Sequence, residues 1–239
     1  MHIVKRGKQR ENDTADCDMG RMRYSQDERD RMTALFVDVT RAIMDREGAD
    51  QVSIRKVAKS AGYNSATMYL YFKDVDELIT MASLSYLVDY CRALAKAQKG
   101  WRSARDTYIY AWEIFCRHAF LYPHVFYRIF FFQHSTPLEQ TIERYYEIFP
   151  HQLDDIDGAV KQMLRGGTLE SRDYRVLRPL VEEGEIGEQS AALVSTMAVG
   201  HFRQLLSEKC ERGELVDDAA QARRQVEAVR FLLCSATDQ

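Results

Sequence analysis

The sequence predicts an all-α protein. Hydrophobic residues make up 46% of the 239 residues, which is enough to build a core. Helix-favouring residues are frequent, apolar residues recur at helical spacing, and the alternation typical of strands is scarce. Only four prolines occur, and none precedes Pro123. The length allows a small domain joined to a larger one, and we expect a flexible arm at 1–24, a first domain at 25–74 and a second at 75–239.

The first helix is predicted to begin after Ser25. Ser25 and Glu28 have the spacing of a capping box, in which each side chain bonds the other residue's backbone N–H. Apolar residues then recur on one face from Phe36 to Met44. Gly48 follows as a natural stop, because glycine accepts the backbone conformation that ends helices.

Two shorter helices are expected before residue 74. Ser53 is a suitable N-cap for the second helix, and Asn64 for a short third helix with the sequence SATMYLYF. Ala58 and Gly62 lie between them at the spacing of a helix-turn-helix. The small residue lets the helices cross closely, and the glycine accepts a positive φ.

The remainder of the chain also predicts helices. Asp74 and Glu77 form a second possible capping box. Prolines mark the starts or ends of other helices, because proline cannot continue a preceding helix. The expected helices lie at 74–98, on either side of Pro123, from Pro137 to Phe149, as shorter pieces within 154–187, and at 188–210 and 217–236.

Charge is distributed unevenly along the chain. The net charge is −3, but residues 1–137 hold 21 basic against 17 acidic residues, and residues 138–239 hold 12 against 19. The segment 51–73 contains no acidic residue and carries four basic ones: Arg55, Lys56, Lys59 and Lys73. An overall acidic protein repels phosphate, but a local acid-free segment can still present a positive face to it.

The segment after Asn64 is rich in hydroxyl groups. Met68 and Phe72 are four residues apart, so both are expected to face inward. The other side chains are then left nearer the outer and flanking faces: Ser65, Ala66, Thr67, Tyr69 and Tyr71. Hydroxyls and the N-terminus of a helix can both bind phosphate. Taken singly, however, Tyr and Thr on such a helix more often pack half-buried than bind a ligand.

Residues 32–80 resemble the N-terminal DNA-binding domain of the TetR family of bacterial transcriptional regulators. The motif residues that fall in register are Gly48, Ser53, Val57, Ala58, Ala61, Gly62, Thr67, Met68, Tyr69, Phe72, Glu77 and Leu78. The resemblance implies that the helix after Asn64 enters the major groove of double-stranded operator DNA. It also implies phosphate contacts at Ser53, Thr67, Tyr69 and Tyr71.

The same resemblance places base-edge contacts at Ser65, Ala66 and Leu70. None of these side chains can make a bidentate contact with guanine or adenine, so DNA shape and the arm with Arg21 and Arg23 are expected to contribute to specificity. Family members usually carry a lysine where this chain has Val75, and Lys73 is the expected substitute. The full expected DNA-binding set is Ser53, Arg55, Lys56, Asn64, Ser65, Ala66, Thr67, Tyr69, Leu70, Tyr71 and Lys73.

The second domain is expected to hold a small-molecule effector, as the resemblance implies. The candidate pocket residues are Tyr86, Tyr90, Trp112, Phe115, His118, Phe126 and Tyr127. Such a lining suits a hydrophobic or aromatic ligand. Each of these residues can equally be plain core, and His118 and Arg128 need polar partners if they are buried.

The last two helices are the expected homodimer interface. The first has a face of small residues and the second an apolar stripe: Ala191, Ala192, Ser195, Ala198 and Gly200, then Val226, Val229 and Leu233. Packing within one subunit explains either face equally well. The twofold symmetry common in oligomers and the resemblance favour a dimer.

We therefore expect a repressor that leaves its operator when the ligand binds, with the helix after Asp74 as the lever. A ligand-responsive activator is the alternative. An α-helical enzyme using Glu113 and His118 is disfavoured, because the two are five residues apart, a poor same-face spacing, and no nucleophile or glycine-rich loop supports it. No cofactor is expected.

Several site classes are not expected from composition. The five cysteines, Cys17, Cys91, Cys116, Cys210 and Cys234, form no CxxC pair, so neither a zinc site nor a disulfide framework is expected. The N-terminal residues lack the apolar core of a secretory signal, and the apolar run 125–132 is too short to span a bilayer. We expect a soluble cytoplasmic protein without membrane association.

Overall fold

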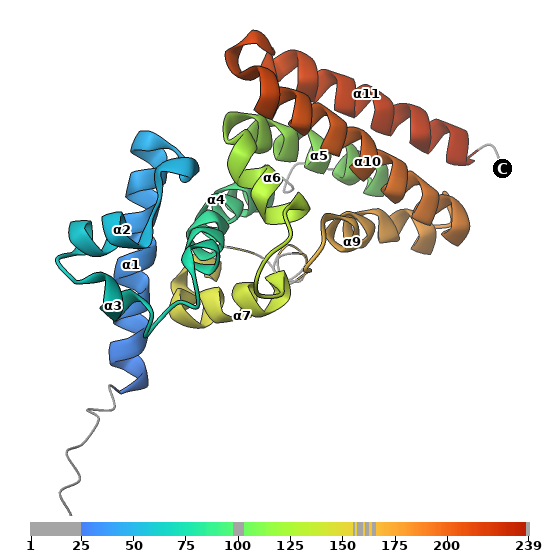
Figure 1. Ribbon diagram of the computed structural model, residues 1–239. Coiled ribbons are helices and arrows are strands. Elements are labelled where there is room, and N and C mark those ends of the chain that lie inside the picture. The colour runs from blue at the N-terminus through green and yellow to red at the C-terminus, as the bar shows by residue number, and fades with distance from the viewer. Residues whose placement is uncertain are drawn as a thin grey trace, which may run out of the picture.

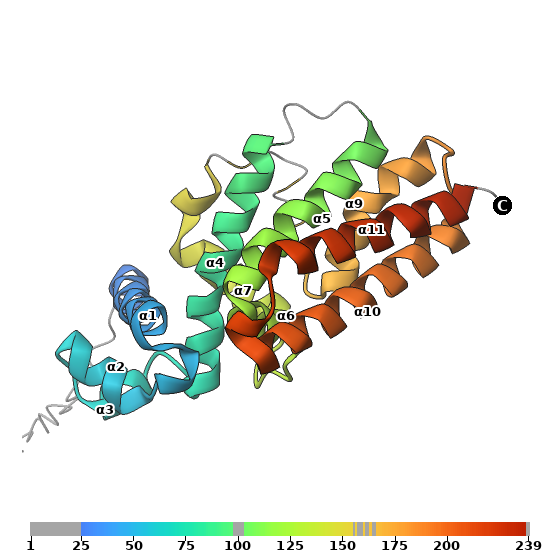
Figure 2. The same ribbon diagram turned by 90° about the horizontal axis from the view of Figure 1, so that it is seen from above.

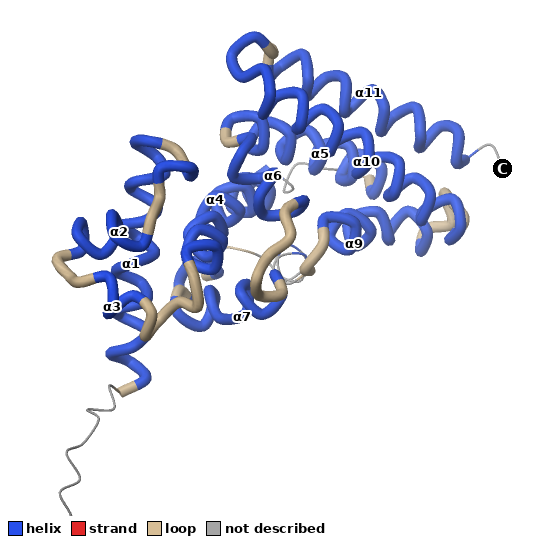
Figure 3. The backbone as a smooth tube through the Cα atoms, in the orientation of Figure 1, coloured by secondary structure: helices blue, strands red, loops and turns tan. Residues whose placement is uncertain are grey.

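The computed structural model describes residues 25–97, 103–154, 156, 160, 163 and 166–237. Over these residues the backbone consists of helices and connecting loops, without a strand, which confirms the predicted all-α class (Figure 3). The helices are α1 Gln26–Glu47, α2 Ile54–Ala61, α3 Ser65–Met68, α4 Val75–Ala97, α5 Ala104–Leu121, α6 Pro123–Phe131, α7 Leu138–Ile148, α9 Leu169–Glu182, α10 Glu188–Arg212 and α11 Asp218–Thr237. Short 3-10 helices are η1 Ala49–Gln51, η3 Pro150–Leu153 and η4 Gly213–Leu215.

The first three helices pack around Phe36. Its ring makes edge contacts with Tyr63 and Tyr71 at 5.5 Å between centroids and with Phe72 at 6.3 Å. The Ser25–Glu28 capping box is present at the start of α1, as predicted. The helix ends at Gly48, whose φ of 92° lies in the region that favours glycine.

The turn between α2 and α3 has the predicted geometry. Gly62 adopts φ 80°, and its N–H donates to the carbonyl oxygens at the end of α2. Tyr63 N–H donates to the Ala58 carbonyl at 2.8 Å, which closes the turn. These bonds fix the direction in which the next segment leaves α2.

The third helix is shorter than predicted. Eight helical residues were expected from Ser65, but regular helix ends at Met68. Tyr71 N–H and Phe72 N–H both donate to the Met68 carbonyl at 3.0 Å, so the chain tightens into a turn. We call residues 65–71 the α3 segment. The tightening brings Tyr71 into the core together with Met68 and Phe72.

Helix α4 lies between the first three helices and the others, as both ribbon views show (Figures 1 and 2). It packs against α1 on one side and against α5, α6 and α7 on the other. Most of its residues are buried, which explains why its sequence is apolar around much of its circumference. It therefore connects the two halves of the molecule.

Helices α10 and α11 lie side by side at the far end from α1 (Figure 2). The predicted boundaries at Pro123 and Pro137 are confirmed, since α6 begins at Pro123 and α7 follows Pro137. Phe202 of α10 contacts Phe115 of α5 at 4.9 Å between ring centroids, which joins these helices to the core.

The predicted arm at 1–24, with Arg21 and Arg23, lies outside the described residues, as does Gln98. In the part of the chain that is described, no helix combines the length and apolar character needed to cross a bilayer.

Candidate functional site

The α3 segment presents an exposed surface of hydroxyl and apolar side chains. Tyr69 is 61% exposed and Leu70 is 59% exposed, so neither contributes much to the core. Ala66 is also exposed, whereas Ser65 and Thr67 are half-buried. These five residues lie on one turn-and-a-half of chain, where the sequence predicted contacts with DNA.

The start of this segment is held by its cap. Asn64 Oδ1 accepts from Thr67 N–H at 2.9 Å and from the Thr67 hydroxyl at 3.1 Å. Ser53 Oγ caps α2 in the same way by accepting from Lys56 N–H at 3.3 Å. Asn64 and Ser53 therefore order the backbone of both helix starts, and each cap satisfies one of the N–H groups that the helix itself leaves unbonded.

One predicted DNA-contacting residue faces the other way. Tyr71 was expected on the outer side, but it is only 5% exposed and its ring packs edge-on against Phe36. The tight turn after Met68 rotates this ring inward. The expectation of an outward Tyr71 is corrected, and the residue belongs to the core of the first three helices.

The basic side chains of this region differ in availability. Arg55 and Lys59 are exposed on α2. Lys56 Nζ forms an ion pair with Glu47, which lies at the end of α1. Lys73 Nζ donates to the Ser135 carbonyl at 3.0 Å, in the loop between α6 and α7. Lys73, the expected substitute for the missing lysine at Val75, is thus engaged with the other half of the molecule in this conformation.

Arg29 adds a basic group that the sequence did not single out. From α1 it donates to the Leu70 carbonyl at 3.0 Å, and its guanidinium lies 5.9 Å from the centre of the Tyr71 ring. This exposed cation therefore lies directly beside the α3 segment. Its separation of 41 residues from Leu70 explains why sequence spacing alone could not find it.

A small cavity lies in the second half of the molecule, between α4, α5, α6 and α9. It leaves about 30 Å³ in which the centre of a water molecule can move. Its lining is mostly aromatic and aliphatic: Leu87, Tyr90, Tyr108, Ala111, Trp112, Phe115, Phe130, Met163, Leu169, Arg172, Asp173 and Val176. Such a space has room for one or two waters.

Two charged residues of α9 lie in this lining. Arg172 is 3% exposed and Asp173 is 7% exposed. The Tyr108 hydroxyl donates to Asp173 Oδ2 at 3.1 Å. Burial raises the pKa of Asp173 to about 7, although Ser195, Tyr108 and Trp112 beside the carboxyl group offset part of that rise. Burial also lowers the pKa of Arg172 below its ordinary value.

The predicted pocket residues are only partly brought together. Tyr90, Trp112 and Phe115 line the cavity, and the other four do not. The latter occupy different places: the Tyr86 hydroxyl donates to Asp45 of α1, His118 Nδ1 lies 2.9 Å from the Ile114 carbonyl, Phe126 packs against Phe115, and Tyr127 packs against Phe131.

A segment near the start of the chain matches the model of a known family. Residues 36–80 match the model of bacterial regulatory proteins of the tetR family. A helix-turn-helix-type transcriptional regulator of uncharacterised role from Haemophilus influenzae is 50% identical over 40 residues. That match covers 17% of this chain and about a fifth, 21%, of the relative. Over residues 36–80 the chain is therefore similar to the DNA-binding part of tetR-family regulators, and it spans about a fifth of the relative that it matches.

Most of the chain shares its fold with solved structures. The structure of RolR in complex with the ligand resorcinol superposes with a TM-score of 0.56 at 16% identity, covering 86% of this chain and 94% of RolR. A protein from Mesorhizobium loti described as a TetR-family transcriptional regulator has a TM-score of 0.54 at 14% identity, covering 89% of this chain and 98% of its own. At these identities the likeness establishes the fold.

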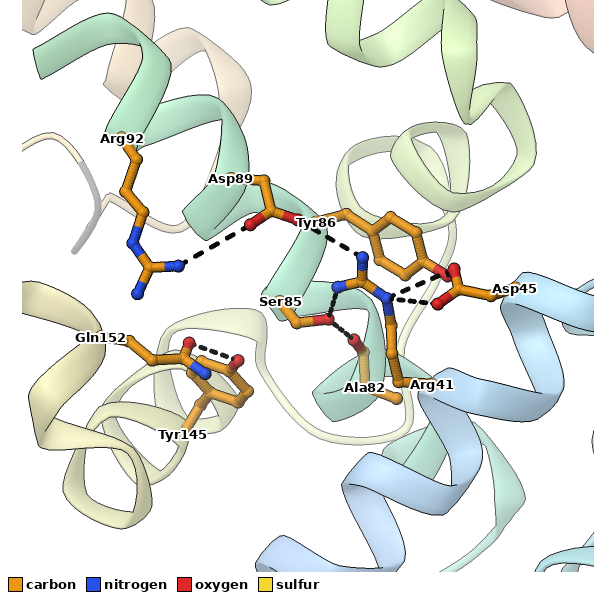
Figure 4. A network of polar contacts seen from close by, with 9 residues as sticks. All are labelled: Arg41, Asp45, Ala82, Ser85, Tyr86, Asp89, Arg92, Tyr145 and Gln152. Carbon is orange, nitrogen blue, oxygen red and sulfur yellow. Dashed lines mark hydrogen bonds and ion pairs between the residues drawn. The ribbon is translucent and has the colours of Figure 1, made fainter. Parts of the chain in front are cut away.

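Helices α1 and α4 are joined by a polar network (Figure 4). Arg41 of α1 pairs with Asp45 at 3.2 Å and with Asp89 of α4 at 3.3 Å, and it donates to Ser85. Its guanidinium lies 3.5 Å from the centre of the Tyr86 ring. These contacts fix α1 against α4 and account for the position of Tyr86.

The start of α4 is held by a second set of contacts, which we call the α4 clasp. The clasp joins Asp76 and Glu77 to Arg128, Ser135 and Arg144 from α6, α7 and the loop between them. Arg128 pairs with Asp76, and Ser135 N–H donates to Asp76 Oδ2 at 3.1 Å. Arg144 pairs with Glu77 at 3.3 Å. Asp76 is therefore the polar partner that the sequence analysis required for Arg128 if that residue was buried.

Helices α10 and α11 carry exposed apolar side chains. Leu193 and Met197 of α10 and Phe231 of α11 are exposed, and Gly200 lies two turns after Leu193. We call these four residues the α10–α11 face. Most residues of the predicted interface are instead used inside the subunit, because Ala191, Ser195, Ala198, Val229 and Leu233 are buried.

The disfavoured enzyme reading gains no geometric support. Glu113 forms an ion pair with Arg117, whereas His118 Nδ1 lies 2.9 Å from the Ile114 carbonyl oxygen. The two side chains therefore have different partners. No cluster of His, Cys, Asp or Glu within the described ranges is arranged to hold a metal ion.

Sequence reasoning did not find Tyr108, Arg172 and Asp173. Adjacent charged residues are usually exposed, so their burial could only be seen once α9 was placed against α5.

Proposed function

We propose that this chain is a DNA-binding transcriptional repressor that acts as a homodimer and leaves its operator when a small molecule binds the second domain. We assign residues 25–74 to the DNA-binding domain and residues 75–239 to the ligand-binding and dimerisation domain. The observation that carries this proposal is the exposed α3 segment, within a domain that matches the TetR family.

The α3 segment has suitable groups for the major groove. The Tyr69 and Thr67 hydroxyls and the backbone N–H groups at the helix start would bind phosphate, and exposed Arg55 and Lys59 would add positive charge. Ala66 and Leu70 would contact base edges, with apolar contacts to thymine methyl groups. Asn64 and Ser53 would act by ordering the two helix starts.

Two copies are needed for tight binding. A helix-turn-helix unit typically reaches a palindromic site as a dimer, with half-sites one helical turn or a multiple of it apart. The α10–α11 face supports self-association, because exposed Leu193, Met197 and Phe231 would be removed from water there. The distance between the two α3 segments would then depend on how each first domain is oriented on its α4.

The α4 clasp would transmit ligand binding to that orientation. Phe130 of α6 lines the cavity, and Arg128, two residues earlier, pairs with Asp76 at the start of α4. A ligand that widens the cavity would displace α6 and therefore α4. Since α1 is fixed to α4 through Arg41, the first domain would follow. A ligand shifts such an equilibrium only by its difference in affinity for the two arrangements.

The effector would be small and largely apolar, given the aromatic lining of the cavity. RolR, which shares the fold, was solved with resorcinol. A ligand-responsive activator is the alternative function. A reporter gene behind a bound promoter decides between them, because deleting the regulator raises expression under a repressor and lowers it under an activator.

The experiment that tests DNA binding uses duplexes selected from a random pool by the purified full chain. Affinity is measured by fluorescence anisotropy over a range of salt concentrations. Thr67→Ala and Tyr69→Phe are expected to weaken binding about 5- to 10-fold each, as for loss of a hydrogen bond to a charged group. Thr107→Ala and Tyr110→Phe on α5 are matched controls expected to leave affinity unchanged. Unaltered binding by both α3 variants would refute the assigned phosphate contacts.

A further inference from the structure

We propose that Asp173, Tyr108 and Trp112 form a recognition site for the hydroxyl group of a small, single-ring aromatic compound, that is, a phenol. This inference rests on the proposed ligand-binding role of the second domain and names the class of compound that the cavity selects. Tyr108 and Trp112 of α5 lie beside Asp173 of α9 in an otherwise mostly apolar lining, whereas the Arg172 guanidinium lies 5.5 Å from the centre of the Phe130 ring.

The polar end of the cavity contains both acceptors and donors. The Asp173 carboxyl group accepts from the Tyr108 hydroxyl at 3.1 Å. The indole Nε1 of Trp112 and the Ser195 hydroxyl are buried near the same carboxyl group. Within the described part of the chain neither of them makes a hydrogen bond of good geometry, although both lie close enough to Asp173 to lower the pKa of its carboxyl group. A buried N–H without a partner costs free energy, so a bound acceptor would be stabilised there.

This combination of groups selects a neutral hydroxyl. A hydroxyl donates one hydrogen bond and accepts others, so it can bond Asp173 and the Trp112 N–H at the same time. An ammonium ligand offers no acceptor to the Trp112 N–H, and a carboxylate ligand offers no donor to the Asp173 carboxyl group. Each would also bring a charge out of water into the cavity, which is costly.

The apolar walls select a flat ring of limited size. The Tyr90 and Phe115 rings meet edge-to-face at 5.1 Å between centroids, and Trp112 meets Phe115 at 5.7 Å. A ligand ring can extend this edge-to-face packing. The present room of about 30 Å³ admits only a water or two, so even one ring must move the walls apart. That displacement is what would couple occupancy to α6 and the α4 clasp.

The test is isothermal titration calorimetry of the full chain with four probes: phenol, toluene, benzylamine and benzoate. Phenol is expected to bind at least about 10-fold more tightly than toluene, which has the same ring without the hydroxyl, because the site's polar groups are paired only by phenol. Benzylamine and benzoate are expected to bind more weakly than phenol. Equal affinity for phenol and toluene would overturn the proposal, as would tighter binding of either charged probe.

Three variants assign the effect to the named groups. Asp173→Asn, Tyr108→Phe and Trp112→Phe are each expected to weaken phenol binding by about 10-fold or more while changing toluene binding less than about 3-fold. Asp154→Asn, an exposed aspartate outside the cavity, is the matched control and is expected to bind phenol normally. The two phenylalanine variants keep the aromatic packing, so they remain informative even if Asp173→Asn folds poorly. Unchanged phenol affinity in all three variants would refute the site.

The same titrations separate this inference from the proposed function. If phenol fails to bind while selected duplex DNA binds normally, the proposed ligand class is wrong and the proposed function as a DNA-binding regulator is retained. If phenol binds as expected but leaves DNA affinity unchanged, the recognition site stands and the proposed release mechanism is wrong.

Discussion

Arg144 Nη2 donates to the backbone carbonyl of Tyr71 at 3.0 Å, while its Nη1 lies 3.3 Å from Glu77 Oε1. One side chain of α7 therefore contacts both the end of the α3 segment and the start of α4. The contact is a direct physical connection between the second domain and the backbone beside the proposed base-contacting residues.

Replacing Arg144 by methionine is expected to loosen the α3 segment. The variant keeps the apolar stem but leaves the Tyr71 carbonyl and the Glu77 carboxylate without this donor, a loss of about 1–2 kcal/mol of stability. Hydrogen exchange of backbone amides at residues 70–77 should become faster, as followed by mass spectrometry. Arg117→Met on α5, where the arginine pairs with Glu113 on the surface, is the control and should exchange as the parent. Equal protection in both variants would show that the contact is not stabilising.

Gly62→Ala tests the turn between α2 and α3. An added Cβ would meet no atom within 4 Å, so the cost arises only from the φ of 80°. We expect a loss of about 1 kcal/mol in the free energy of unfolding, measured with urea. Gly187→Ala has the same open surroundings and a φ of −75° that suits any residue, so it loses only the preference for glycine over alanine as the N-cap of α10 and should destabilise less than Gly62→Ala. Equal effects would contradict the strain argument.

Asp173→Asn should change how stability depends on pH. The pKa of Asp173 is raised from 3.8 to about 7 by burial, so the folded state holds its proton where the unfolded state has lost it. The protonated carboxyl group therefore contributes its full share to the free energy of unfolding below about pH 4. This contribution is lost progressively as the pH rises to about 7. Between pH 5 and pH 8 the parent should therefore lose roughly 2–3 kcal/mol relative to the asparagine variant.

Urea unfolding at both pH values measures that difference. Asp154→Asn is the control. Because Asp154 is largely exposed, replacing it should leave the dependence of stability on pH as it is in the parent. If the parent and Asp173→Asn have parallel profiles, the carboxyl group is not protonated in the folded state at neutral pH.

Leu193→Asp should disrupt the proposed dimer. Leu193 is 60% exposed on the α10–α11 face, and a carboxylate at its position would have to be desolvated against the second copy. The dissociation constant of the dimer, from sedimentation equilibrium, should rise by about 100-fold or more. Leu215→Asp is the matched control, since Leu215 is 82% exposed in the η4 turn and lies outside this face. A monomeric parent would refute the interface itself.

Much of the first domain could be predicted from sequence because its signals are local. Ser25, Ser53 and Asn64 are caps with short-range partners, and Gly48 and Gly62 adopt the positive φ for which glycine is suited. Tyr71 was misplaced because helical periodicity was extended beyond Met68. The direction of its ring depends on a tight turn and on the place left beside Phe36, which no local pattern encodes.

The helices from α4 onward were harder to predict because their contacts are long-range. Helix boundaries at Pro123 and Pro137 followed from proline chemistry. The cavity, in contrast, brings Tyr108 to Asp173, which is 65 residues away along the chain. An aromatic-rich sequence supplies many equivalent pocket candidates, so only tertiary packing separates Trp112, which lines the cavity, from Tyr86, which holds α1.

The inward position of Tyr71 and Phe72 separates two tasks within one short peptide. Its anchors belong to the interior, whereas Ala66, Tyr69 and Leu70 project outward and leave the interior almost untouched. Exchanging the projecting residues should therefore cost the scaffold little. If these residues contact bases as proposed, promoter preference could drift in evolution, or be reprogrammed by design, while the remaining architecture stays intact.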